Sequence, residues 1–168
     1  MAAKVFGKAL CLALCSVLLV TCGDIGGGGA SPDFQVQQSE VKGPQARAFY
    51  EARGWAPAWG DDAAEQLEKA LANAPSHGLR AEMFLPADLP SEAAEREVAL
   101  TDAALRYASA LASGYIDPKS LGNIYTIPRP KPDLAAGLNQ ALTTEELGTW
   151  LESLAPPTDE NRALSKAY

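Results

Sequence analysis

Cysteine is scarce in this 168-residue sequence, and every cysteine lies near the N-terminus. The three are Cys11, Cys15 and Cys22, and none follows them. Because a disulfide framework, a thiolate metal site and a nucleophilic thiol all need cysteine, the chain beyond residue 22 has none of these. His77 is the single histidine, whereas a metal site needs several ligands at set spacings. We therefore expect no metal or other cofactor.

Residues that favour sheets are also few. Aromatic residues make up 7% of the chain, and β-branched residues are scarce, whereas alanine and leucine dominate. This composition favours helices over strands. The fold class is therefore expected to be all-α.

Basic residues are outnumbered, with 14 Lys and Arg against 21 Asp and Glu, and the formal charge is −7. A nucleic-acid partner requires a basic surface that neutralises phosphates. Peripheral binding to anionic lipid headgroups requires one as well. The acidity thus argues against nucleic acid as a partner and against direct membrane binding.

The N-terminal segment has the pattern of a signal peptide. Lys4 and Lys8 form a positive region, and the apolar run 9–20 that follows has the length of a signal-peptide core. An uncleaved membrane anchor is the alternative, although the run is short for a membrane span. Removal of residues 1–21 takes away two positive charges and no negative ones, so the formal charge changes from −7 to −9.

The end of this segment predicts a lipid anchor at Cys22. Residues 19–22, Leu-Val-Thr-Cys, resemble the lipobox of bacterial lipoproteins, although Thr21 stands where that pattern has Gly, Ala or Ser. The glycine run 26–29 is typical of a flexible tether. We expect a lipoprotein of the periplasm or cell envelope, bound to the membrane only through this lipid. Ordinary cleavage after Ala30, which gives a secreted protein, is the alternative.

The composition changes again beyond the predicted signal peptide. Residues 22–43 are rich in Gly and then in Ser, Pro and Gln, which is typical of a flexible linker. Residues 44–168 carry helical periodicity and no alternating strand pattern. We expect a single small domain there, with about six short helices. The predicted ranges are 45–53, 61–74, 91–113, 134–141, 143–154 and 158–168.

Polar residues with helix-capping chemistry precede several of these ranges. The spacing of a capping box occurs at 62–65 and again at 143–146. Capping and the helix dipole explain the paired acids at these helix starts, so we do not assign them to glycoside hydrolysis, which needs two carboxylates facing each other across a cleft. The predicted N-caps are Asp61 or Asp62, Ser91, Asp133 and Thr143.

Four short motifs follow one another through residues 44–168. They are the run 49–54 followed by Trp59, the turn His77-Gly78-Leu79, the stretch 100–107 continued by 114–118, and the stretch 151–157 continued by 162–164. In residues, order and spacing they resemble the scaffold, or N-terminal, domain of large murein L,D-transpeptidases.

The resemblance implies an architecture of three parts, of which this sequence carries one. Such enzymes join the scaffold to a peptidoglycan-binding module and to a catalytic domain. In that domain the cysteine of a Ser-x-Gly-Cys-x-Arg motif attacks a peptide carbonyl, with a histidine as base. This sequence contains no such motif. We therefore expect no enzyme, but a non-catalytic scaffold-type domain with a structural or regulatory role in bacterial peptidoglycan remodelling.

Two origins of such a domain remain open. It is either part of a truncated or split transpeptidase, or a separate protein whose partner is a catalytic L,D-transpeptidase chain. Peptidoglycan itself is the alternative partner.

Trp55 and Trp59 are the candidate contacts for a ligand or partner. They flank Pro57 in a loop, where flat aromatic surfaces could stack on sugar faces. The alternative function is therefore a peptidoglycan-binding module that uses this loop, whereas a position in the core is the structural interpretation. His77 is predicted to end a helical turn. The proline-rich strip 128–132 is either a docking strip or a spacer.

Overall fold

The computed structural model describes residues 34–122 and 131–167. Within these ranges it contains six α-helices, three short 3₁₀ helices and no strand, which confirms the all-α prediction. In chain order the elements are α1 (Pro44–Ala52), α2 (Asp61–Ala72), η1 (Ala74–His77), η2 (Ala81–Met83), α3 (Ala93–Ser113), η3 (Pro118–Leu121), α4 (Leu134–Thr143), α5 (Leu147–Ser153) and α6 (Asp159–Ala167).

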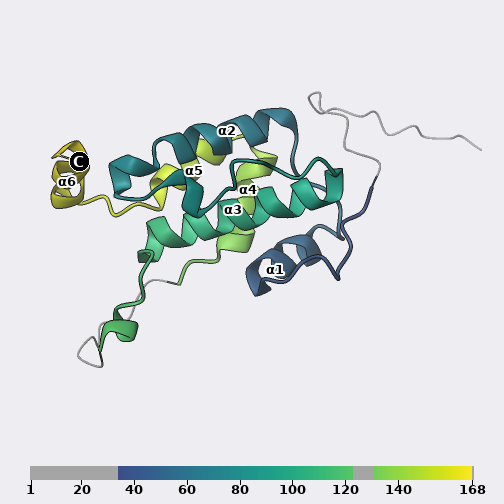
Figure 1. The fold of residues 1–168 in the computed structure, drawn as a ribbon, viewed down its shortest axis with the longest axis horizontal. Coiled ribbons are helices and arrows are strands. Elements are labelled where there is room, and N and C mark those ends of the chain that lie inside the picture. The colour runs from purple at the N-terminus through teal and green to yellow at the C-terminus, as the bar shows by residue number, and fades with distance from the viewer. Residues whose placement is uncertain (1–33, 123–130, 168) are drawn as a thin grey trace, which may run out of the picture.

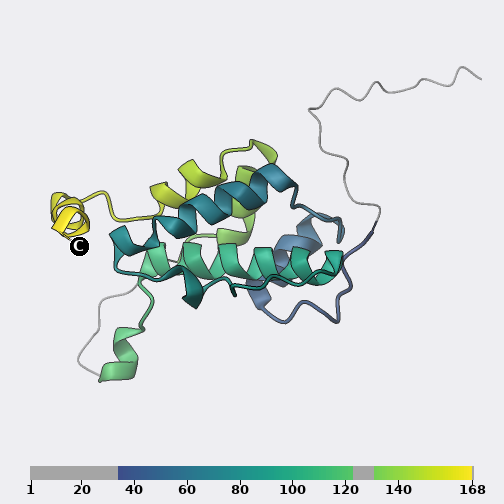
Figure 2. The same cartoon turned by 45° about the horizontal axis from the view of Figure 1, so that its top comes forward.

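Helix α3, the longest, is the centre of the bundle (Figures 1 and 2). It contacts α1, α2, α4 and α5, while α1 also packs on α4 and α2 on α5. Helix α6 lies apart at one end of the molecule and contacts η1 (Figure 1). Its Leu164 is 71% exposed.

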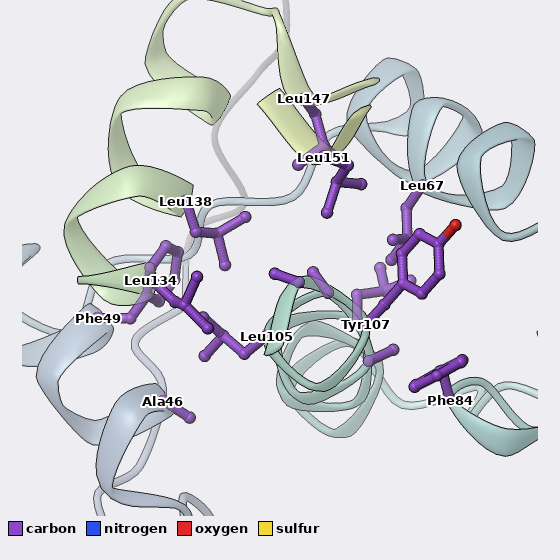
Figure 3. Packing of buried hydrophobic residues seen from close by; sticks show 14 of the residues in the cluster. Ala46, Phe49, Leu67, Phe84, Leu105, Tyr107, Leu134, Leu138, Leu147 and Leu151 are labelled. Atoms are coloured by element: carbon purple, nitrogen blue, oxygen red, sulfur yellow. The ribbon is translucent and has the colours of Figure 1, made fainter. Parts of the chain in front are cut away.

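The core forms on two sides of α3. Figure 3 shows Leu105 pointing towards Phe49 and Leu134, and Tyr107 pointing towards Leu67. The ring centroids of Tyr107 and Phe84 lie 5.2 Å apart. The buried face of α3 is therefore wider than the single stripe that its periodicity predicts, because neighbouring helices cover the helix from both sides. The Tyr107 hydroxyl donates to the Ala70 carbonyl at 3.2 Å, and burial raises the pKa of Tyr107 to about 12.

The prediction of a flexible linker is wrong over residues 34–43. Val36 and Val41 are buried in the core, and the Val36 amide donates to the Trp55 carbonyl at 2.9 Å. Two isolated valines carry no periodicity, so the sequence pattern alone does not reveal that this segment docks. The rest of the predicted linker lies outside the described residues, as do the signal peptide, Cys22 and most of the strip 128–132.

Of the predicted N-caps, Asp133 is confirmed, since its carboxylate accepts from the Ala136 amide at 3.0 Å. The others are wrong by one to three residues. The N-cap of α2 is Gly60, that of α3 is Glu92, and that of α5 is Glu146. Thr143 instead ends α4, and its hydroxyl donates to the Asn139 carbonyl within that helix.

Candidate functional site

The segment 53–60, which carries both candidate tryptophans, leaves α1 through a tight turn. Gly54 and Trp55 both adopt left-handed backbone conformations, with φ of 61° and 65°. Glycine accepts this conformation freely, but a bulky residue does so only when its surroundings hold it. The Trp55 amide donates to the Tyr50 carbonyl at 2.8 Å, which helps to close the turn. The chain is thereby directed back across α3.

The two tryptophans have different environments. Trp59 is only 8% exposed, and its indole N–H donates to the Thr101 hydroxyl oxygen at 2.8 Å. Trp55 is half-buried and stacks on Tyr50, with ring centroids 6.1 Å apart. The Arg47 guanidinium lies 5.9 Å from the Trp55 ring centroid. The core interpretation therefore holds for Trp59, and Trp55 is the residue of this pair with more surface for a partner.

A buried polar cluster of Glu97, Tyr50 and Thr101 lies beneath this segment. Glu97 is 3% exposed, and Thr101 is fully buried. The Glu97 carboxylate accepts from the amides of Ala58 at 2.7 Å and Trp59 at 3.2 Å. These bonds hold the segment to α3.

Hydroxyl groups extend the cluster. The Tyr50 hydroxyl lies 2.7 Å from the Thr101 oxygen and 3.3 Å from Glu97 Oε1. Burial raises the pKa of Glu97, although the two amides, the Tyr50 hydroxyl and Arg53 oppose that rise. Burial and the neighbouring Glu97 charge also raise the pKa of Tyr50.

A second polar group joins α1 to α4. The Arg53 guanidinium donates to Asn139 Oδ1 at 3.1 Å and to the Pro57 carbonyl at 3.3 Å, and it lies over the Phe49 ring at 5.5 Å. Asn139 in turn donates to the Phe49 carbonyl at 3.2 Å. These contacts fix the end of α1, the loop and α4 together.

The remaining residues that the sequence analysis considered, His77 and the acids Asp61 and Asp62, lie at the ends of helices. His77 is the last residue of η1, and Gly78 follows it with a φ of 69°, as the predicted turn requires. The acids Asp61 and Asp62 lie in the first turn of α2. Within the described residues, no group of three or more His, Cys, Asp or Glu side chains is arranged to hold a metal ion. No helix of the same ranges is long and apolar enough to span a bilayer.

Glu97 and Tyr50 were not among the candidates taken from the sequence, although one signal pointed to Glu97. It precedes Thr101 by four residues and Ala104 by seven, so it lies on the buried face of α3. A carboxylate at such a position needs hydrogen-bond donors from another element. The sequence does not show which element supplies them.

These features define a small helical domain whose interior polar groups tie its elements together. Residues 44–167 match the family described as "Scaffold domain". The chain therefore belongs to that family, the scaffold domain of L,D-transpeptidase-type proteins, as the four motifs indicated. Comparison with curated proteins and with solved structures gives no match.

Proposed function

We propose that this domain is a non-catalytic scaffold with a structural or regulatory role in peptidoglycan remodelling. The observation that carries the proposal is the position of its motif residues. Tyr50, Trp59 and Thr101 come from two different motifs, and they are buried and hydrogen-bonded as one cluster. Phe49 and Leu151, from the first and last motifs, lie in the core. Part of each of these motifs thus builds the interior, whereas Tyr115, Ile116 and Leu164 of the third and fourth motifs are exposed. A well-packed interior is what a domain that acts through its shape requires.

The chemistry of the chain supports the same proposal. Acyl transfer between murein peptides needs an accessible nucleophile with a base beside it. No cysteine follows Cys22. Glu97, a buried acid, is enclosed and already accepts from two amides and a hydroxyl. We infer that the acyl-transfer step resides in another domain or chain.

We also propose that the protein is exported and held at the envelope membrane by a lipid on Cys22. The support is the lipobox-like run that ends at Cys22 and the glycine-rich segment behind it. Labelling of cells with radioactive palmitate should mark the wild-type protein and not the Cys22→Ser variant. Equal labelling of the two would exclude this anchor.

Purified protein incubated with isolated sacculi tests the proposed role. Alone, it should leave the muropeptide profile unchanged, because no cysteine thiol follows residue 22 to act as the nucleophile of acyl transfer. Together with a catalytic L,D-transpeptidase chain from the same organism, it should change the rate of crosslink formation. New or lost crosslinks with the protein alone would contradict the non-catalytic assignment. An unchanged rate with the enzyme would contradict a regulatory role.

A further inference from the structure

Glu97 is a buried acid without a cationic partner. Within the described part of the chain no Lys or Arg lies within ion-pair distance of its carboxylate, and its neighbours are amides and hydroxyls. Burial favours the neutral form of a carboxyl group, and at Glu97 burial outweighs the opposing charge of Arg53 and the hydrogen bonds, so the pKa is raised. The hydrogen bonds around Glu97 must therefore be compatible with a bound proton as well as with a free carboxylate.

The hydroxyls of Tyr50 and Thr101 can satisfy both forms. When Glu97 is ionised, Tyr50 donates to Glu97 Oε1 and Thr101 donates to Tyr50. When Glu97 is protonated, its O–H donates to Tyr50 and Tyr50 donates to Thr101. Thr101 can then donate to the carbonyl one turn earlier, as threonines in helices commonly do. The oxygen–oxygen separations of 3.3 Å and 2.7 Å allow either direction of donation, so only the hydroxyl hydrogens move between the two forms.

The Trp59 indole N–H donates to Thr101 in both arrangements, because the Thr101 oxygen remains an acceptor. The two amides that face Glu97 also keep an acceptor, since a protonated carboxyl group retains lone pairs on both oxygens. One proton from solvent can thus enter the cluster without a change of backbone.

We propose that Glu97 is a proton-binding site that controls how firmly the segment 53–60 is held against α3. The segment is held most firmly when Glu97 is neutral, and it opens more often when Glu97 is ionised. Because Trp55 belongs to this segment, its position at the surface then depends on pH. This inference does not rest on the proposed role in peptidoglycan remodelling.

Other charged groups face this cluster from each neighbouring element. Arg53 approaches from the end of α1 and favours the ionised form of Glu97. Asp102 of α3 acts on Tyr50. Asp61 of α2 and Arg96 of α3 line a surface hollow of about 220 Å³, which Glu97 and Trp59 also line.

The sign of the pH dependence follows from burial. In the closed form burial raises the pKa of Glu97, whereas in the open form the carboxyl group is solvated and has an ordinary pKa. The closed form therefore binds the proton more tightly. The stabilisation of the closed form by this proton is complete below the ordinary pKa of glutamate. It is lost as the pH rises through the raised pKa of the closed form.

Hydrogen exchange at the amides of Ala58 and Trp59 tests the proposal. We expect the opening equilibrium, corrected for the intrinsic exchange rate, to increase with pH from 4.5 to 8. Between the two pKa values of Glu97 the increase is up to about tenfold per pH unit. The Glu97→Gln variant should show a flat profile. The matched control Asp102→Asn, whose burial also raises a carboxyl pKa on α3, should keep the wild-type slope.

A flat wild-type profile, or the wild-type slope in Glu97→Gln, would overturn the proposal. If Glu97→Gln does not fold, ¹³C NMR titration of the Glu97 carboxyl group in the wild-type protein decides the question. A pKa above that of ordinary glutamate is expected. A pKa at or below it would overturn the proposal as well.

Discussion

Replacement of Trp59 by alanine is expected to lower the free energy of unfolding by about 3–5 kcal/mol. The indole is 8% exposed, and it packs against the core while donating to Thr101. Its removal leaves a cavity and takes a donor away from the buried cluster. Because small domains are stable by about 5–15 kcal/mol in total, this is a large fraction. Urea unfolding followed by far-UV circular dichroism measures the change.

Trp55→Ala is the matched control, since it removes the same side chain from the same loop. Trp55 is half-buried, and among the described residues its indole has no hydrogen bond like that of Trp59 to Thr101. We expect a smaller loss of stability from this variant. Equal losses, or a larger loss for Trp55→Ala, would contradict the assignment of Trp59 to the core.

Replacement of Gly137 or Gly148 by alanine should change the free energy of unfolding in opposite directions. A Cβ added to Gly137 in α4 would lie 2.7 Å from the indole nitrogen of Trp150, whereas one added to Gly148 in α5 would meet no atom within 4 Å. Overpacking costs about 1–3 kcal/mol, and the gain from alanine in a helix is up to about 1 kcal/mol. Gly137→Ala should therefore lower the free energy of unfolding.

Gly148→Ala should instead raise the free energy of unfolding by about 0.5 kcal/mol through helix propensity alone. Urea unfolding of both variants gives the comparison. A stabilised Gly137→Ala protein would show that Trp150 does not pack against α4 as described. A strongly destabilised Gly148→Ala protein would show that α5 is enclosed on that side.

The helices could be predicted from the sequence because their signals are local. The six predicted ranges correspond to the six α-helices, and the cap at Asp133 forms as expected. The capping box at 143–146 does not form, because the chain does not start a helix at Thr143. The chain turns sharply there, with Glu145 in a left-handed conformation at φ 59°, so α4 continues to Thr143 and α5 starts only at Leu147.

The docking of distant segments could not be predicted in this way. Val36 and Val41 are buried because they meet the bundle, and nothing in their own neighbourhood indicates it. The difference in burial between Trp55 and Trp59 depends on the contact of Trp59 with Thr101, which is 42 residues away in the sequence. The donors that satisfy Glu97 likewise come from 38 and 39 residues away. Such pairings are properties of the fold and not of a sequence window.

Exchange of the tryptophan indole hydrogens, followed by NMR, tests most directly whether the motif residues form a closed interior. The Nε1 hydrogen of Trp59 should exchange only when segment 53–60 opens or the whole domain unfolds, because it is buried and bonded to Thr101. That of Trp55 should exchange far faster. If the Trp59 hydrogen exchanges as quickly as that of Trp55 under native conditions, the cluster is open to solvent, and a scaffold built on it is the wrong description.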